Sequence, residues 1–422
     1  MKILLVIHQF LPESVGGTEY YSFWLAQGLT ERHDCEVAIW SFRETPLNRY
    51  HDFGVHRTNY VGVQVAELVF NLGAAEEGQR RDWQGGFQRS FFERELDLFK
   101  PDAVIVCHAI KHSAEVFEVC ASRRIPAIAL ITDYWSVCPL HTLLRYDGSL
   151  CSEPEADLCT ACVTNTFKQW LEGSHVRMAM QERPDAMRDA FLKAERLVVL
   201  TQFAKDMFLE HGFPSTAMEL IEHGPPVEQW LEPDIQPQAA ADPPHILFIG
   251  NATSSKGAKL LTAALSKLPH ANIRLKLVMS PQPEREYHEL LKQAKLDQRI
   301  TICPPFAEQE TWQHMFSCAA VAVPAQWHEN GSLVAKSAVL SGTPLLASEV
   351  GTLIELKEKS PTANITLLPR DKPEAWASAM LQAAENFSDS GSRLKKLDPD
   401  AAPTFLKTVH EWHRILQKVT TR

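Results

Sequence analysis

Residues 245–278 read HILFIGNATSSKGAKLLTAALSKLPHANIRLKLV and contain the pattern on which the fold depends. The apolar run at residues 245–249 predicts a strand buried on both faces, and the small residues at 250–257 predict a loop. Residues 259–268 have helical spacing, and residues 274–278 are predicted as a second strand. A strand, a helix and another strand in this order predict a crossover unit with parallel strands.

The same alternation continues towards the C-terminus. We expect strands at residues 300–303, 320–323 and 344–347, and helices at residues 284–294, 309–316, 333–340, 373–386 and 403–420. Residues 245–402 therefore form one predicted α/β domain with a parallel sheet.

The N-terminal half of the chain repeats this organisation. We expect strands at residues 2–7, 35–42, 103–107, 127–131 and 197–200, and helices at residues 18–29, 113–122 and 202–211. Six prolines without periodicity mark residues 225–244 as a linker. The predicted fold is thus α/β, with two doubly wound Rossmann-like domains at residues 1–224 and 245–402. Residues 403–422 form a C-terminal helix, and the cleft between the domains is the expected ligand site.

The composition excludes several classes of protein. The chain has 422 residues, of which 45% are hydrophobic and 22% charged, as in ordinary globular proteins. Its 42 Lys and Arg against 52 Asp and Glu leave a net charge of −10, so a general nucleic-acid binder is not expected. Nine cysteines are too sparse for a secreted scaffold held by disulfides.

The distribution of apolar residues indicates a soluble protein. The run Ile3 to Ile7 ends at His8, which is short for a signal peptide. No stretch approaches the ~18–20 apolar residues of a membrane-spanning helix. We therefore expect a cytoplasmic protein. Its aromatic loop residues could make peripheral contact with the inner face of the membrane.

Three loops that follow predicted strands have residues suited to binding an anion. Gly16 and Gly17 open a predicted helix, where backbone N–H groups can approach a phosphate closely. The alternative is an ordinary turn with Thr18 as the helix cap. The second loop, at residues 250–257, combines small residues with Lys256 but lacks the order of a P-loop. An ordinary solvated loop is the alternative there.

The third loop places an acid, an amide, a glycine and a hydroxyl before the helix predicted at 333–340. These residues are Glu329, Asn330, Gly331 and Ser332. A helix N-terminus has unpaired N–H groups that favour an anion, and Glu329 can accept hydrogen bonds from hydroxyls. In the alternative interpretation, Glu329 is a capping carboxylate of the first helical turn.

Four of the nine cysteines lie within 25 residues, at Cys138, Cys151, Cys159 and Cys162. The closing Cys-x2-Cys pair is typical of a tetrahedral metal site, and a metal is favoured over disulfides in a cytosolic chain. We predict a structural zinc with a closed shell of thiolates, which would order a loop and take no part in chemistry. An iron–sulfur cluster and buried or redox-active thiols are the alternatives.

Polar residues end three predicted strands of the N-terminal sheet. His8 and His108 follow their strands directly and Asp133 follows one residue later, so we expect all three at the carboxyl edge of the sheet. Each has a structural alternative, since a histidine can be a satisfied core residue and an aspartate can serve a turn.

Several motifs together resemble one known family. They are PESVGGTE at residues 12–19, TDYWSVCP at 132–139, FIGNATSSKG at 248–257, PAQWHEN at 324–330 and Gly-Thr-Pro at 342–344. These stretches resemble the family-4 glycosyltransferases of the GT-B fold, in which two Rossmann-like domains face each other across a cleft. Residues 138–162 resemble the cysteine-rich insertion of a subset of that family.

The resemblance implies a retaining glycosyltransferase that needs no catalytic metal. It implies a nucleotide-sugar donor bound in the C-terminal domain and a glycan or lipid-linked acceptor bound in the N-terminal one. The role would be in cell-surface polysaccharide biosynthesis. The resemblance also implies that the C-terminal helix at 403–422 crosses back to the N-terminal domain.

The resemblance assigns roles to individual residues. Glu329 would bind the hydroxyls of the donor sugar, Lys256 would neutralise the diphosphate, and His108 would join them as a catalytic residue. His108 and Asp133 would line the acceptor side. The implied donor-binding residues are Gly16, Gly17, Gly250, Asn251, Lys256, Glu329, Asn330, Gly331, Ser332, Leu333 and Ser337.

The chain departs from the family pattern at three positions. Ser337 stands where the second acid of a Glu-x7-Glu motif usually binds the nucleotide ribose. Asn251 stands where an arginine is frequent, and Thr132 where a histidine commonly precedes the aspartate. Two alternatives therefore stay open at this point, a nucleotide-sugar epimerase on the same scaffold and a non-catalytic relative.

Overall fold

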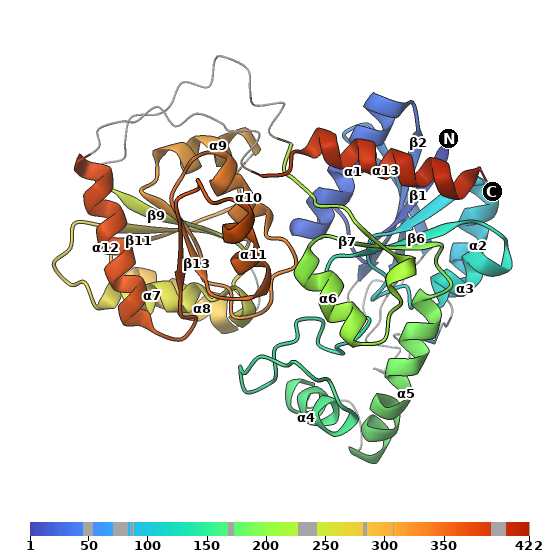
Figure 1. Ribbon diagram of the computed structural model, residues 1–422, viewed down its shortest axis with the longest axis horizontal. Coiled ribbons are helices and arrows are strands. Elements are labelled where there is room, and N and C mark those ends of the chain that lie inside the picture. The colour runs from blue at the N-terminus through green and yellow to red at the C-terminus, as the bar shows by residue number, and fades with distance from the viewer. Residues whose placement is uncertain are drawn as a thin grey trace. The chain divides into compact units, whose positions relative to one another are not determined.

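The computed structural model describes residues 1–44, 54–70, 83–84, 86, 88–167, 173–226, 243–281, 285–306, 308–389 and 402–421 (Figure 1). The chain divides into two compact units. Unit 1 comprises Met1–Glu222 and Lys407–Arg422, and unit 2 comprises His223–Leu406. Each unit is a sheet with helices packed on it. Among the described residues, no helix is both long and apolar enough to cross a bilayer.

Unit 1 is built on an eight-stranded sheet with the order β3-β4-β2-β1-β5-β6-β7-β8. Its strands are β1 (Lys2–Val6), β2 (Glu36–Glu44), β3 (Gly54–Tyr60), β4 (Val63–Phe70), β5 (Ala103–Val106), β6 (Ala127–Ile131), β7 (Arg196–Val199) and β8 (Met218–Leu220). All neighbours pair in parallel except β3 and β4. The strand order reverses between β1 and β5, so the loops after these strands meet at the carboxyl edge.

The helices of unit 1 are α1 (Gly17–His33), α2 (Gln88–Phe99), α3 (Glu115–Ser122), α4 (Ala156–Thr166), α5 (Gly173–Phe191) and α6 (Gln202–Glu210). The C-terminal helix α13 (Phe405–Thr420) also packs on this unit, beside α1 (Figure 1). Its Trp412 Nε1 donates a hydrogen bond of 2.7 Å to the hydroxyl of Tyr21, and both side chains are buried. The end of the chain is therefore part of the N-terminal unit.

Unit 2 is built on a six-stranded parallel sheet with the order β11-β10-β9-β12-β13-β14. Its strands are β9 (His245–Ile249), β10 (Arg274–Val278), β11 (Ile300–Cys303), β12 (Ala320–Val323), β13 (Leu345–Ser348) and β14 (Ile365–Leu368). Its helices are α7 (Ala258–Ser266), α8 (Arg285–Leu296), α9 (Glu308–Ser317), α10 (Leu333–Leu340), α11 (Gly351–Lys359) and α12 (Pro373–Asp389). Here the strand order reverses between β9 and β12.

The core of unit 2 explains why its central strands are rich in apolar residues. Side chains of β9 and β10, such as Phe248 and Leu277, are fully buried together with Trp376 of α12. Strands β9 and β12 are buried on both faces along almost their whole length, whereas β10 has Arg274 exposed and Lys276 half-buried. The apolar runs of β9 and β12 therefore predict these two strands with little ambiguity.

The predicted fold class, α/β with two doubly wound parallel sheets, is confirmed. Strands β6, β9, β10, β11 and β12 and helix α10 have the predicted bounds. The sequence analysis missed α2, α4, α5, α11, β3, β4, β8 and β14. Of these, β3 is a largely exposed edge strand whose polar residues hide the apolar signal. Residues 227–242 of the predicted linker lie outside the described residues, and the cleft between the domains stays a prediction.

Candidate functional site

Two loops of unit 2 meet because β9 and β12 are neighbours at the switch point of the sheet. The loop after β9 ends at Gly257, which has a φ of +73° and lies so close to Pro324 that a Cβ would be 2.0 Å from the Pro324 carbonyl oxygen. In addition, the Gln326 N–H donates to the Ser255 carbonyl at 2.7 Å. Only glycine satisfies both the backbone conformation and the close approach.

These loops bring the predicted residues Lys256 and Glu329 into contact. Lys256 Nζ donates to Glu329 Oε1 at 2.6 Å, and Trp327 Nε1 donates to the same oxygen at 2.9 Å. The ammonium group also lies 5.3 Å from the centroid of the Trp327 ring. Glu329 is only 5% exposed, so this is a charge-assisted contact with little competition from water.

The N-terminus of α10 lies directly after this pair in the chain. Ser332 is the N-cap, and its Oγ accepts a hydrogen bond from the Ala335 N–H at 3.3 Å. Because Ser332 caps the helix, Glu329 is not the capping carboxylate of the alternative interpretation. Gly331, with a φ of +77°, turns the chain into the helix. A helix N-terminus of this kind favours an anion.

The other predicted donor residues of unit 2 lie on the same segments. Gly250 follows β9, and its N–H donates to the Val278 carbonyl at 3.0 Å. Asn251 is the next residue of that loop. Asn330 lies on the loop before α10 and Ser337 lies on α10, and both side chains are buried. The structure thus gathers these positions at one sheet edge, and their roles stay predictions.

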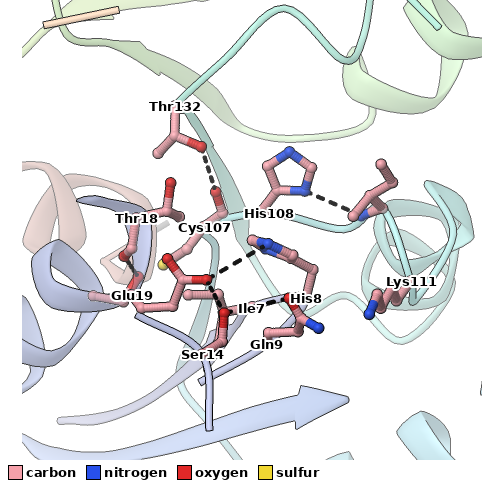
Figure 2. Close-up of polar contacts among 12 residues, drawn as sticks. Ile7, His8, Gln9, Ser14, Thr18, Glu19, Cys107, His108, Lys111 and Thr132 are labelled. Carbon is pink, nitrogen blue, oxygen red and sulfur yellow. Dashed lines mark hydrogen bonds and ion pairs between the residues drawn. The ribbon is translucent and has the colours of Figure 1, made fainter. Parts of the chain in front are cut away.

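Unit 1 has a second polar cluster at the carboxyl edge of its own sheet (Figure 2). His108 Nε2 lies 2.8 Å from Asp133 Oδ2, and the Ile110 N–H donates to His108 Nδ1 at 3.2 Å. Since Nδ1 accepts a hydrogen bond, the ring proton is on Nε2 and is donated to Asp133. The prediction that His108 and Asp133 share this edge is therefore confirmed, while their acceptor role stays a prediction.

Asp133 is ionised in this environment. Burial alone would raise the pKa of Asp133, but His108, His141 and the Trp135 N–H stabilise the charge and lower the pKa to about 2. The Trp135 N–H donates to Asp133 Oδ1 at 2.9 Å. The carboxylate therefore serves as a fixed acceptor that orients the His108 ring.

The loop that contains Gly16 folds around a buried carboxylate. Ser14 Oγ donates to Glu19 Oε1 at 2.8 Å, and His8 Nε2 lies 3.7 Å from the same oxygen (Figure 2). A Cβ on Gly16 would be 2.6 Å from Glu19 Oε2, so the glycine makes room for this side chain. Burial raises the pKa of Glu19 despite the hydrogen bond from Ser14. Gly17 is the first residue of α1, whose N-cap is Gly16 and not Thr18.

Sequence reasoning did not single out Glu19, Lys111 or His112 as members of this cluster. Burial lowers the pKa of His112 to about 4 and that of Lys111 below its usual range, and it lowers the pKa of His8 strongly. His112 Nε2 bonds the Ile7 carbonyl at 2.8 Å, and the rings of His8 and His108 are 4.6 Å apart. The one available signal was Glu19, which stands three residues after Gly16 as in a capping box.

The four predicted metal ligands lie in the part of unit 1 between β6 and β7, which we call the cysteine excursion. Cys138, Cys151 and Cys162 are buried and Cys159 is half-buried, and all four are free thiols. Burial and the neighbouring thiols raise the pKa of Cys159 to about 12. Within the described ranges, no group of three or more His, Cys, Asp or Glu side chains is arranged to hold a metal ion. The structural zinc therefore stays a prediction.

Comparison with known sequences identifies a family for part of the chain. Residues 243–386, within unit 2, match the family model described as Glycosyl transferases group 1. The D-inositol 3-phosphate glycosyltransferase of Xylanimonas cellulosilytica is 30% identical over 158 residues, 36% of each chain. The enzyme of the same name from Mycobacteroides abscessus is 26% identical over 199 residues, 44% of each chain. The chain thus matches less than half of the length of these curated relatives.

Comparison with solved structures supports the fold over the whole chain. The Anabaena protein HepE, in complex with UDP and glucose, has a TM-score of 0.66 at 16% identity and covers 99% of this chain and 100% of its own. The trehalose-6-phosphate synthase OtsA has a TM-score of 0.66 at 12% identity and covers 100% of this chain and 99% of its own. Unit 2 therefore contains a glycosyl transferases group 1 domain, and the chain as a whole has the two-sheet GT-B fold of known glycosyltransferases.

Proposed function

We propose that the protein is a glycosyltransferase that moves a sugar from a nucleotide-sugar to a glycan or lipid-linked acceptor, in cell-surface polysaccharide biosynthesis. The observation that carries this proposal is the Lys256–Glu329 contact of 2.6 Å at the switch point of the group 1 domain. It places a cation, a carboxylate and a helix N-terminus on adjacent loops, which suits a sugar joined to a diphosphate.

In the proposed mechanism, the bond between the anomeric carbon and the diphosphate oxygen breaks. A bond from an acceptor hydroxyl oxygen to the same carbon forms on the same face, and the acceptor proton leaves with the nucleoside diphosphate. Lys256 and the N-terminus of α10 stabilise the negative charge that develops on the diphosphate. Glu329 accepts hydrogen bonds from donor hydroxyls while it keeps Lys256 in place, and no catalytic metal is needed for this step.

The proposed acceptor side is the polar cluster of unit 1. His108, oriented by Asp133, lies at the carboxyl edge of that sheet with Glu19 and Ser14 on the neighbouring loop. Carboxylate, imidazole and hydroxyl groups of this kind hydrogen-bond sugar hydroxyls. We propose that this cluster positions the accepting hydroxyl group.

We also propose a cytoplasmic location with peripheral contact with the membrane. Large apolar side chains are exposed on the excursion that contains the cysteines and on α5, namely Tyr146, Leu158, Phe167 and Met178. Such side chains can enter the interfacial region of a bilayer. A lipid-linked acceptor would be reached from there.

The experiment is a transfer and hydrolysis assay with a panel of nucleotide-sugars, starting with UDP-sugars because HepE was solved with UDP and glucose. Glu329→Gln keeps the size of the side chain but removes the charge that holds Lys256. We expect kcat/KM to fall by roughly 100-fold or more, the loss typical of a group that stabilises the transition state.

The matched control is Glu374→Gln, which breaks a Lys–Glu contact of 3.0 Å with Lys267 on the surface of the same unit. This variant is expected to turn over like the wild type, since exposed ion pairs contribute little. If Glu329→Gln were as active as Glu374→Gln, the assignment of the donor site would be wrong.

One observation favours a second candidate, a non-catalytic relative that binds nucleotide-sugars. Ser337 and Asn251 replace charged residues of the family pattern, and a lost charge-assisted contact weakens phosphate binding. Nucleotide-sugar binding without turnover across the donor panel would support this candidate over the enzyme.

A further inference from the structure

A buried pair of polar side chains lies behind the loop that precedes α10. Lys336 is 5% exposed and His223 is 3% exposed, although the residues around Lys336 on α10 are apolar or small. Lys336 Nζ donates to the His223 carbonyl oxygen at 2.7 Å and lies 3.2 Å from His223 Nδ1. Both residues belong to unit 2.

The His223 ring connects Lys336 to the loop. An ammonium group has only protons to donate, so His223 Nδ1 accepts and the ring proton is on Nε2. The ring also makes a hydrogen bond to the backbone of Gly331. Because a ring N–H can only donate, its partner there is the Gly331 carbonyl. Burial and the Lys336 charge lower the pKa of His223 strongly, so the ring is neutral.

The bonded peptide is the one that turns the chain into α10. Gly331 has a φ of +77° and immediately precedes the N-cap Ser332. A glycine in this region has many accessible conformations, and a hydrogen bond to its carbonyl selects one of them. The Lys336–His223 pair therefore determines how the backbone enters the first turn of the helix.

Burying an ammonium and an imidazole costs desolvation energy that an apolar pair of similar volume would avoid. The polar pair is thus a poor choice for stability alone. We propose that Lys336 and His223 are positioning residues of the donor site, which hold the Gly331 peptide in the conformation that presents backbone N–H groups to a diphosphate. This inference rests on the proposed function, because it concerns the same donor.

The test compares two probes, UDP and uridine, by isothermal titration calorimetry of the full chain. Lys336→Met and His223→Leu are each expected to weaken UDP binding by about 10-fold or more, a loss on the order of one charge-assisted hydrogen bond. Uridine has no diphosphate, so its binding is expected to change by less than about 2-fold. His223→Gln can still accept from Lys336 and donate to Gly331, so it is expected to bind UDP more tightly than His223→Leu.

The matched control is Lys276→Met, since Lys276 Nζ makes a similar contact of 3.1 Å with His314 Nδ1 elsewhere in unit 2. It is expected to leave UDP binding unchanged. Thermal denaturation accompanies each titration, so a variant that loses the fold is recognised by its lower Tm. In that case Lys336→Gln, which retains a hydrogen-bond donor, takes the place of Lys336→Met, and it is expected to bind UDP more weakly than the wild type but more tightly than His223→Leu.

Equal weakening of UDP and uridine in Lys336→Met, or no weakening of either, would overturn the positioning role. If the wild-type chain binds UDP, the proposed donor site is supported, whatever the two variants do. A wild-type chain that binds neither UDP nor ADP, GDP or dTDP would overturn the donor site itself, and the positioning role with it.

Discussion

At the scale of single residues, the carboxyl edge of each sheet has a buried carboxylate that contacts a lysine or histidine side chain. Glu329 contacts Lys256 at 2.6 Å in unit 2, and Asp133 contacts His108 at 2.8 Å in unit 1. Glycines lie beside both clusters where a Cβ would collide with a neighbour, since Gly257 lies against the Pro324 carbonyl and Gly16 against the Glu19 carboxylate. The geometry of each edge therefore depends on these glycines as well as on the charged side chains.

Asp133 makes the stability of unit 1 depend on pH. Its pKa is lowered from an ordinary 3.8 to about 2, so the folded state favours the ionised carboxylate. The contribution of Asp133 to stability is fully present above the pKa that its carboxyl group has in the unfolded chain. It is lost as the pH falls through the pKa that the same group has in the folded chain. At about 1.4 kcal/mol per pKa unit, Asp133→Asn is expected to cost about 2 kcal/mol at pH 7.

Urea denaturation at pH 7, pH 4 and pH 2.5 measures this difference. The gap between the wild type and Asp133→Asn should narrow as the pH falls towards 2. The control is Asp189→Asn, at an exposed position of α5 in the same unit, which should leave the stability unchanged at each pH. A gap that stays constant over this pH range would refute the role assigned to the ionised carboxylate.

At the scale of elements, two parts of unit 1 lie outside its regular alternation of strands and helices. Helix α13 ends the chain but packs on unit 1, through the hydrogen bond from Trp412 to Tyr21 on α1. The excursion between β6 and β7 contains the four cysteines and the helices α4 and α5. The sequence predicted α13 at residues 403–420, whereas α4 and α5 were missed because they do not belong to the regular alternation of strands and helices.

Trp412 is expected to anchor α13. Trp412→Ala removes a fully buried ring and its hydrogen bond, which should cost about 3–5 kcal/mol. Hydrogen exchange followed by mass spectrometry should show faster exchange in α1 and α13 and no change in α7 and α12. Arg414→Ala, at an exposed position of the same helix, is the control and should exchange like the wild type. Faster exchange spread evenly over both units would contradict the docking of α13 on unit 1.

The cysteine excursion is expected to contain one structural zinc per chain. Cys151 is held by a hydrogen bond of 2.8 Å from its N–H to the Leu143 carbonyl, and Cys159 and Cys162 are on α4. Elemental analysis should find the zinc, and Cys159→Ser should lower both the zinc content and the Tm. Cys303→Ser in unit 2 should change neither. A metal-free protein whose Tm does not respond to a chelator would show that the thiols are simply buried.

At the scale of the whole molecule, two sheets of the same doubly wound design are joined in one chain. In each sheet the strand order reverses once, between β1 and β5 and between β9 and β12. The polar clusters lie at these two points, because only there do loops on either side of the reversal meet. The location of both clusters is thus a consequence of topology.

The sequence by itself determined the fold class and singled out the charged residues of the proposed donor loops. Apolar runs of strand length alternate with helical spacing, and such local periodicity is visible without any long-range contact. Lys256 and Glu329 were recognisable because each follows a clear strand. Their contact of 2.6 Å across 73 positions of sequence was not predicted, because it depends on β9 and β12 being neighbours in the sheet.

Only the tertiary structure decided which distant residues meet. Glu19 under the Gly16 loop, His112 on the Ile7 carbonyl and the Lys336–His223 pair depend on strand order and on burial. Nothing in the local pattern around His223 or Lys336 indicates a partner, since they are 113 positions apart. Periodicity reports how each segment buries its own face, whereas the pairing of segments is set by packing between elements far apart in the chain.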